Sequence, residues 1–492
     1  MWKRLCSGLA GLVCAGGVWM PLANLPARAQ TTHYCKLTPT AIAQKDVLRQ
    51  AAMTGDHTAE QQYKALVQQH GQQLQQCRNR TWPRQQALWI RLYPCDLNHG
   101  ALERLMDQIV DWGYNTVYVE TFYNGTVLLP EAQNQTPWPS VVRHPSYRNT
   151  DLLAEAIARG HERGLKVYSW MFSMNFGYAY AQRSDRQQAL ARNGYGQTSL
   201  MALRGEDGIG AEEAFIDPYS PQAKQDYAQM LQAVLQRRPD GVLFDYIRYP
   251  KGVGGASIAS RVQDLWIYGP AAQQSLYSRA TNSSGQELIQ RYLSQGQITE
   301  SDINSVMNRY PGEADVQWQG RSPSVSPSAP LGQRRAALQN ELWQLSVAHA
   351  LQGVVDFFNW AIAPVQQQQI PAGAVFFPRA NAAVQSGYDS RLQPWDQFPQ
   401  TAEWHPMAYG VCGNTGCIVS EVERVLSQAS SPAQVRPVLA GVWGSPMTNR
   451  PSLEAQMSAI QRVAPQIQSV SHFAYSWQDP QTDRERKFCR LN

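Results

Sequence analysis

An acid, a guanidinium and two phenols occur together in the segment P-D-G-V-L-F-D-Y-I-R-Y-P, residues 239–250. The apolar run V-L-F that leads into Asp245 is typical of a parallel strand buried on both faces. Polar groups directly after such a strand lie where catalytic (β/α)8 barrels keep their active sites. The segment therefore predicts a polar cluster of Asp245, Tyr246, Arg248 and Tyr249 at the place of the active site, with Asp245 as a catalytic carboxylate. In the structural alternative, Asp245 only caps the next helix or pairs with Arg248.

A second carboxylate is expected at the same end of the barrel. The segment V-Y-V-E-T puts Glu120 at the C-terminal end of the second predicted strand, on the face where Asp245 lies. Two such carboxyl groups can divide acid and base work between them. The structural alternative for Glu120 is an ion pair with Arg91 on the first strand. Weaker cases near other strands and turns are Asp96, Glu403 and Asp479.

The elements that must position these residues alternate between apolar strands and amphipathic helices, which is the pattern of βα units around a parallel sheet. Helices are predicted at 97–112, 150–163, 221–237 and from 333 to about 360. Eight strands, the number that a closed barrel requires, are predicted at 87–93, 115–120, 165–171, 241–245, 373–378, 401–409, 435–443 and 469–477. The predicted fold class is therefore α/β, a (β/α)8 TIM barrel.

The barrel accounts for residues 81–480, and other segments surround it. Residues 30–80 are rich in Gln and Ala with helical spacing, which indicates an N-terminal helical segment. A long insertion at 251–330, between the fourth and fifth strands, includes the Ser/Pro-rich run R-S-P-S-V-S-P-S-A-P and is expected to be partly mobile. Residues 481–492 are expected to form a C-terminal tail.

The first 29 residues have the layout of a secretory signal peptide. Lys3 and Arg4 precede an apolar stretch, and the small-residue ending A-R-A reaches Ala29. Pro21 and Pro26 interrupt the apolar stretch, so a stable membrane anchor is not expected. We expect the protein to be exported and cleaved near Ala29, and then to be periplasmic or extracellular.

Without this leader the chain has 40 basic against 38 acidic residues, a balance that gives no argument for nucleic acid as a partner. Six cysteines remain, and an even number in an exported chain favours disulfides over metal ligands. No H-x-H, H-E-x-x-H or C-x-x-C pair occurs, so neither a metal nor a cofactor is expected. Sequence order suggests the pairs Cys35–Cys77 around the helical segment, Cys412–Cys417 within one loop, and Cys95–Cys489 after the first and last strands, which are neighbours in a closed barrel.

The chain resembles the glycosyl hydrolase-like 10 family of bacterial (β/α)8 proteins. The resemblance is clearest in F-I-D-P-Y-S-P-Q-A-K-Q-D-Y (215–227) followed by D-G-V-L-F-D-Y-I-R-Y-P (240–250), and it extends to A-L-W-I-R, L-K-V-Y-S-W and H-P-M-A-Y. It implies a glycan-active hydrolase, with bacterial cell-wall glycan as one substrate class. Asp245 matches the acid of the fourth-strand motif. The chain departs from the family pattern in its N-terminal helical segment and in the stretch between the fourth and fifth strands, so substrate identity does not transfer.

Glycosidic bonds are usually cleaved by two carboxyl groups, one as proton donor and one as nucleophile or base. Asp245 is the first of these and Glu120 the second, and a gap of two strands would suit the roughly 6.5 to 9.5 Å separation of an inverting enzyme. Sugar rings stack on aromatic faces, while their hydroxyls need polar partners. The expected substrate-binding residues are Trp170, Tyr409, Trp443 and Trp477 as aromatic surfaces, and Tyr246, Arg248, Asn175 and His405 as polar partners.

Together these patterns predict an exported glycoside hydrolase that acts on a polysaccharide or on peptidoglycan glycan. The rival hypothesis is a non-catalytic glycan-binding protein on a degenerate glycosidase barrel. The fifth predicted strand favours this rival, because its segment G-A-V-F-F-P-R carries no acid, although some retaining barrel enzymes place their proton donor near there.

Overall fold

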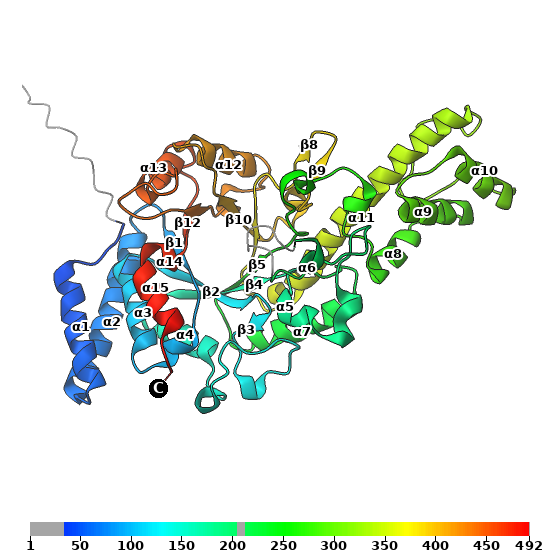
Figure 1. Ribbon diagram of the computed structural model, residues 1–492. Coiled ribbons are helices and arrows are strands. Elements are labelled where there is room, and N and C mark those ends of the chain that lie inside the picture. Colours follow the sequence, from blue (N-terminus) through cyan, green and yellow to red (C-terminus); the bar gives the residue numbers. More distant parts are fainter. Residues whose placement is uncertain (1–33, 204–211, 492) are drawn as a thin grey trace, which may run out of the picture. The chain divides into compact units, whose positions relative to one another are not determined.

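Eight parallel strands close into a barrel in the computed structural model (Figure 1). Each strand pairs with the next in the order given below, and β1 pairs with both β2 and β12, so no edge of the barrel is open. All eight strands lie at the predicted places, which confirms the TIM barrel. They are β1 (Gln85–Ile90), β2 (Thr116–Tyr123), β4 (Lys166–Phe172), β5 (Gly241–Asp245), β7 (Ala372–Phe376), β10 (Glu403–Ala408), β11 (Val438–Ala440) and β12 (Ser469–Phe473).

The structure describes residues 34–203 and 212–491. The chain divides into two units, 1–34 and 35–492, and every helix and strand described here belongs to the second unit. The signal peptide predicted at 1–29 lies outside the described residues. None of the helices in the described ranges is long and apolar enough to cross a membrane.

Helices surround the barrel, and local sequence signals explain where several of them begin. The helix before β5, α7 (Pro221–Leu235), is an example. Its N-cap residue Ser220 accepts a hydrogen bond from the backbone N–H of Ala223, and Pro221 occupies the first turn. Residues 377–402, all of them described, contain no α-helix, so the fifth strand returns to the sixth by a loop. The outer helices are α3 (Ala101–Asp111), α4 (Leu152–Glu162), α7 (Pro221–Leu235), α11 (Leu331–Gln367), α12 (Gly416–Leu426), α13 (Leu453–Val463) and α15 (Pro480–Phe488).

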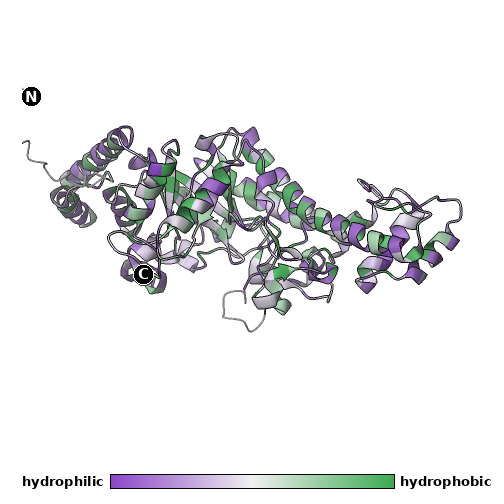
Figure 2. Ribbon diagram, turned by 90° about the horizontal axis from the view of Figure 1, so that it is seen from above, coloured by the Kyte–Doolittle hydropathy of each residue, from purple (hydrophilic) through white to green (hydrophobic). Residues whose placement is uncertain are grey.

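Aromatic side chains fill the interior of the barrel. The Trp89 ring meets the rings of Tyr118 and Trp170 edge to face, each at 4.8 Å between centroids. The Trp89 indole also donates a hydrogen bond to Ser471 of the neighbouring strand β12. Figure 2 shows hydrophobic residues concentrated in the central strands, whereas the helices carry both hydrophobic and hydrophilic residues. The interior of the barrel is therefore a packed core, and a pocket formed by the barrel strands must lie above this core, at the strand ends.

Two N-terminal helices, α1 (Pro39–Met53) and α2 (His57–Arg78), pack against α3 and α4 through buried charges. Asp107 of α3 accepts hydrogen bonds from Arg49 at 2.9 Å, from Tyr63 at 2.8 Å and from Arg163 at 2.8 Å. Next to it, Lys45 of α1 pairs with Asp111 at 2.5 Å. We call this set of six residues, from Lys45 to Arg163, the seam.

All three predicted disulfides are present: Cys35–Cys77, Cys95–Cys489 and Cys412–Cys417. The second ties the segment after β1 to the end of α15. Arg486 of α15 reinforces this connection, because its guanidinium makes two hydrogen bonds of 2.8 Å to Asp96. Residues 481–488, expected to belong to a tail, are therefore helical and packed on the barrel.

The insertion between β5 and β7 is largely helical. It contains α8 (Pro270–Tyr277), α9 (Ser283–Gln295) and α10 (Glu300–Arg309), which lie beside the N-terminal half of α11 (Figure 1). Leu288, Ile289, Ile303 and Val306 form a small core among these helices. The composition, rich in Gly, Ser and Gln, concealed these helices in the sequence. Residues 321–330 form neither helix nor strand, and their expected mobility stays a prediction.

Short elements complete the fold around the strand ends. They are β3 (Thr126–Val127), β6 (Ile258–Ala259), β8 (Ala383–Val384), β9 (Gly387–Asp389), α5 (Gly177–Ala181), α6 (Ser199–Ala202) and α14 (Tyr475–Gln478). Most of them belong to the loops that follow β2, β4, β5 and β7, which is where a TIM barrel builds its site.

Candidate functional site

A pocket of about 420 Å³ opens at the C-terminal ends of the barrel strands. We call it the strand-end pocket. Its size falls within the range of small-molecule sites. Its lining combines carboxylates, guanidinium groups and aromatic rings: Arg91, Glu120, Asn124, Trp170, Phe172, Glu212, Glu213, Asp245, Tyr246, Arg248, Phe377, Met407, Tyr409 and Phe473.

Asp245 is the last residue of β5 and is only 6% exposed. Its Oδ1 accepts a hydrogen bond of 2.6 Å from the backbone N–H of Tyr246, and its Oδ2 accepts one of 3.1 Å from the Trp170 indole. Burial raises the pKa of Asp245 to about 6, although these donors and the nearby Arg248 favour the ionised form. Asp245 is thus an oriented carboxyl group that changes charge near neutral pH.

Tyr246 has an unusual backbone conformation for a residue with a side chain, with φ of +54°. Such a conformation costs on the order of 1–3 kcal/mol and persists only where the surroundings enforce it. Here it aims the backbone N–H of Tyr246 at Asp245, and the Tyr246 ring packs on Phe172 at 4.2 Å between centroids. The Arg248 guanidinium lies over the Tyr246 ring, 4.4 Å from the ring centroid.

Glu120 lies on β2 and is 1% exposed. Its Oε2 forms an ion pair with Arg91, as the structural alternative predicted, and both residues line the strand-end pocket. Its Oε1 is buried without a hydrogen-bond partner among the described residues. Burial raises the pKa of Glu120 against the opposing effect of Arg91. The ion pair therefore leaves one carboxylate oxygen of Glu120 uncommitted in a residue that lines the pocket.

Sequence reasoning missed Glu213, which lies in the loop between β4 and α7. Glu213 lines the strand-end pocket, and the Tyr246 hydroxyl donates a hydrogen bond of 2.9 Å to its carboxylate. No strand pattern marks residue 213. The signal that could have found it is its place two residues before F-I-D-P-Y, the first of the two segments that carried the family resemblance.

The aromatic part of the pocket matches the sequence prediction only in part. Trp170 and Tyr409 line the pocket as predicted. Phe172, Phe377 and Phe473 also line it and were not predicted. These rings come from β4, from β12 and from the residues that follow β7 and β10, so they offer apolar faces on several sides of the carboxylates.

Four predicted substrate-binding residues do not line the pocket. Asn175 is fully buried, and its Oδ1 accepts hydrogen bonds from the backbone of Gly177 and Ala214. His405 is also fully buried, because it points into the barrel core one layer below Met407 and contacts Glu403 at 3.2 Å. The other two, Trp443 and Trp477, lie beyond the ends of their strands.

Trp443 follows the short strand β11, and its indole donates a hydrogen bond of 3.0 Å to the Tyr114 hydroxyl. Its ring packs on His472, whose side chain points away from the barrel interior between strands and helices. Trp477 belongs to α14 and meets the pocket only through Phe473, at 6.2 Å between ring centroids. The prediction placed both tryptophans in strands that prove shorter than expected.

Four other polar residues considered in the sequence, Tyr249, Asp96, Glu403 and Asp479, do not line the strand-end pocket. Tyr249 is fully buried and lies outside the pocket lining. Asp96 accepts the Arg486 guanidinium, Glu403 pairs with Arg436 at 2.9 Å, and Asp479 caps α15 by accepting the Thr482 N–H. In the described residues, no group of three or more His, Cys, Asp or Glu side chains is arranged to hold a metal ion.

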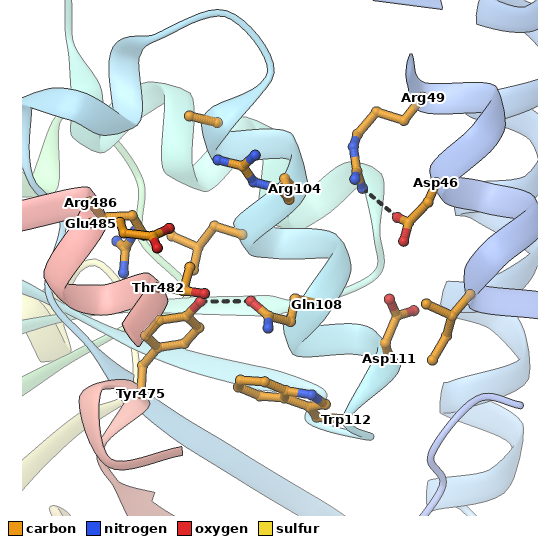
Figure 3. Close-up of a pocket in the computed structure, with 13 residues that line it drawn as sticks. Asp46, Arg49, Arg104, Gln108, Asp111, Trp112, Tyr475, Thr482, Glu485 and Arg486 are labelled. Atoms are coloured by element: carbon orange, nitrogen blue, oxygen red, sulfur yellow. Dashed lines mark hydrogen bonds and ion pairs between the residues drawn. The ribbon is translucent and has the colours of Figure 1, made fainter. Parts of the chain in front are cut away.

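A second pocket, of about 390 Å³, lies between α1, α3 and α15 (Figure 3). Its floor is formed by Trp112 and Tyr475, whose ring centroids are 5.5 Å apart. The Tyr475 hydroxyl donates a hydrogen bond to Gln108, and Arg49 pairs with Asp46 one turn away on α1. No residue of a barrel strand lines this pocket, so it belongs to the packing of the outer helices.

The chain is similar to a number of solved structures and matches the model of one protein family. Among solved structures, a hypothetical protein from Ruminiclostridium thermocellum is 14% identical over 33% of this chain and 77% of its own, with a TM-score of 0.23. A GH18 chitinase from Pseudoalteromonas aurantia is 10% identical over 80% of this chain and 94% of its own, with a TM-score of 0.37. A β-N-acetylhexosaminidase is 12% identical over 86% of this chain and 74% of its own, with a TM-score of 0.38. Likeness at these TM-scores carries no argument about substrate or activity.

No curated protein matches the chain. The model of one protein family, described as Glycosyl hydrolase-like 10, matches residues 86–278. This range runs from β1 into the insertion and includes Glu120, Glu213 and Asp245. Residues 86–278 of this chain thus match the glycosyl hydrolase-like 10 family, as the motif around Asp245 predicted.

Proposed function

We propose that this protein is an exported glycoside hydrolase, that it cleaves glycosidic bonds of a polysaccharide, and that Asp245 and Glu120 carry the reaction. Bacterial cell-wall glycan is the substrate class that we expect first. One observation carries the proposal: two buried carboxyl groups line the same pocket at the strand ends, and burial raises the pKa of both. A glycosidase needs such a pair, with one group protonated while the other is ionised.

The hydrogen bonds favour different roles for the two groups. Both oxygens of Asp245 accept N–H donors, which stabilises its ionised form as nucleophile or base. Glu120 keeps Oε1 without a partner among the described residues, so a proton on that oxygen is free to pass to a leaving group. The charge of Glu120 also raises the pKa of Asp245, so the two groups titrate as a pair.

The remaining lining suits a sugar polymer. Trp170, Phe172, Tyr409 and Phe473 offer faces for the C–H surfaces of sugar rings, and Arg248 offers donors for hydroxyl groups. Three disulfides fit a protein that matures in an oxidising compartment, which agrees with the signal peptide that the sequence predicts.

The test is incubation of the mature protein with peptidoglycan glycan strands and with a panel of polysaccharides, followed by mass spectrometry of released reducing ends. Asp245→Asn and Glu120→Gln are expected to bind glycan and release no fragments. Glu131→Gln is a matched control, because Glu131 is exposed and lies outside the pocket. Release of fragments at the wild-type rate by Asp245→Asn would contradict the proposed mechanism.

The rival function is glycan binding without turnover. The Arg91–Glu120 ion pair favours this rival, because Arg91 stabilises the ionised form of Glu120 and so opposes its use as a proton donor. In addition, the residue that lines the pocket after β7 is Phe377 rather than an acid. Under this hypothesis the wild-type protein retains glycan and releases no fragment, and Asp245→Asn leaves the affinity unchanged.

A further inference from the structure

Tyr246 connects two carboxyl groups of the strand-end pocket. Its backbone N–H donates a 2.6 Å hydrogen bond to Oδ1 of Asp245, and its hydroxyl donates a 2.9 Å hydrogen bond to Oε1 of Glu213. The two bonds leave from opposite ends of one residue. Whatever fixes the Tyr246 ring therefore also fixes the backbone N–H that orients Asp245.

Glu213 is itself held by buried neighbours. The Ser199 hydroxyl donates to the Glu213 carbonyl at 2.9 Å, and it accepts from the Phe215 N–H at 3.1 Å. The Asn175 amide oxygen accepts from the Ala214 N–H at 3.1 Å. Asn175, predicted as a partner of substrate hydroxyls, instead anchors the segment that carries Glu213.

These contacts help to hold Tyr246 in its left-handed backbone conformation. A residue with a side chain adopts a φ of +54° only where other contacts hold it there. The Phe172 ring and the Arg248 guanidinium hold the Tyr246 ring by its faces. Glu213 supplies the one contact in the described residues that holds its hydroxyl.

We propose that Glu213 is a positioning residue for Asp245 and that it acts through Tyr246. The proposal rests on the proposed function, because it assumes that the orientation of Asp245 matters for turnover. It assigns Glu213 no direct contact with the reacting bond.

Several other groups face Asp245 and must be separated from the effect of Glu213. They come from four strands or their ends: Glu120 of β2, Trp170 of β4, Arg248 after β5 and Tyr409 after β10. None of them is changed in the variants below. Removing the charge of Glu213 would by itself lower the pKa of Asp245. Loss of the Tyr246 N–H bond would raise it, so the two causes have opposite signs.

The experiment measures the protonation of Asp245 without relying on turnover. A water-soluble carbodiimide with an amine labels carboxyl groups in their protonated form, and mass spectrometry of the peptide that contains Asp245 gives the pH of half-maximal labelling. The variants are Tyr246→Phe, Glu213→Ala, Glu213→Gln and the double variant Tyr246→Phe/Glu213→Ala. Near-UV circular dichroism and thermal unfolding confirm that each variant is folded.

We expect Tyr246→Phe to raise the labelling midpoint of Asp245 by about half a pH unit, because the N–H bond loosens, and Glu213→Ala to raise it by less, because the lost charge of Glu213 acts in the opposite direction. On a cleaved substrate, each lowers kcat about tenfold with little change in KM. The double variant is no worse than either single variant, since both break the same connection. Glu213→Gln keeps an acceptor for the Tyr246 hydroxyl, so its kcat lies above that of Glu213→Ala.

Two results would overturn the proposal. A labelling midpoint of Glu213→Ala at or below that of the wild type would show that Glu213 acts only through its charge. A higher KM with unchanged kcat would show that Glu213 binds substrate directly. If the wild-type protein cleaves no glycan, the proposed function fails, but the labelling midpoints still decide whether Glu213 positions Asp245.

Discussion

The strand-end pocket and the seam both bury carboxyl groups beside basic residues, yet they use them differently. At the seam, both oxygens of Asp107 accept donors from the surrounding helices. In the pocket, Glu120 keeps one oxygen without a partner among the described residues. Both regions also hold an aspartate whose pKa burial raises to about 6, namely Asp111 and Asp245. A raised pKa therefore does not identify a functional group by itself; its place and its unused hydrogen-bonding capacity do.

The seam shows what a purely structural cluster requires. Lys45 and Arg163 are almost completely buried, and each has a carboxylate within hydrogen-bonding distance. A buried charge without its partner is strongly unfavourable. The seam thus fixes the N-terminal helices on the barrel, while the pocket leaves room for a substrate to complete its interactions.

The largest difference between the regions is expected in activity. Asp245→Asn should lower kcat by about a thousandfold or more, because it removes a carboxylate that the proposed mechanism requires. Its thermal unfolding midpoint should not fall. The measurements are release of reducing ends and calorimetry. If Asp245→Asn lost its fold together with its activity, Asp245 would be a structural residue like the carboxylates of the seam.

The opposite outcome is expected at Asp107. Asp107→Ala leaves Arg163 buried without its main counter-charge, so the free energy of unfolding should fall by about 3–5 kcal/mol. Activity of the remaining folded protein should change little. Urea unfolding at several protein concentrations measures the loss. Asp46→Ala, which removes a partly exposed partner of Arg49, is the control and should cost less than about 1 kcal/mol.

The two aspartates with a pKa near 6 should respond to substitution with opposite signs. The folded-state pKa of Asp245 lies above the roughly 3.9 of an unfolded chain, so its stabilising contribution is complete below pH 4 and is lost as the pH rises through 6. Asp245→Asn keeps a neutral group at all pH values and should be about 3 kcal/mol more stable than the wild type at pH 7, but equally stable near pH 3.

Asp111→Asn should be less stable than the wild type at pH 7, because it leaves Lys45 buried without a counter-charge. Urea unfolding at pH 3 and pH 7 tests both variants. Destabilisation by Asp245→Asn at pH 7 would mean that this carboxylate is structurally satisfied, like those of the seam.

The smallest effect is expected from single donors to Asp245. Trp170→Phe removes the indole N–H that stabilises the ionised carboxylate, so the pKa of Asp245 should rise and the acidic limb of the pH–rate profile should move up by about half a unit. Trp443→Phe is the matched control, because its indole bonds to Tyr114 outside the pocket, and it should leave the limb in place. A downward shift for Trp170→Phe would contradict the assignment of Asp245 as the ionised group.

Sequence reasoning was most successful where one physical pattern sufficed. The apolar strand ending in Asp245 was correctly predicted, and Asp245 and Glu120 line the same pocket, although β2 continues past Glu120 to Tyr123. The order of strands in a closed barrel also predicted the Cys95–Cys489 disulfide. These features follow from burial and strand order, which can be inferred directly from the pattern of apolar residues along the sequence.

Depth and loop geometry were harder to predict. His405 shares the inward orientation of Met407 but lies one layer deeper, and alternation alone does not specify depth. Trp443 follows a strand that ends at Ala440, so the expected alternation no longer applies to it. Glu213 reaches the pocket from a loop, where no periodic pattern exists. Its role depends on contacts with Ser199 and Tyr246 that only the fold brings together.

The pairing of β1 with β12 has a consequence for how the chain is made. Leu88 pairs with His472, so the first strand keeps an unsatisfied edge until nearly the whole chain has been synthesised. The bond from Cys95 to Cys489 and the Arg486–Asp96 contacts form later still. A product that ends before β12 begins at Ser469 would therefore retain an open, aggregation-prone strand edge, whereas one that ends between β12 and Arg486 would close the barrel but lack the Arg486–Asp96 contacts and the disulfide.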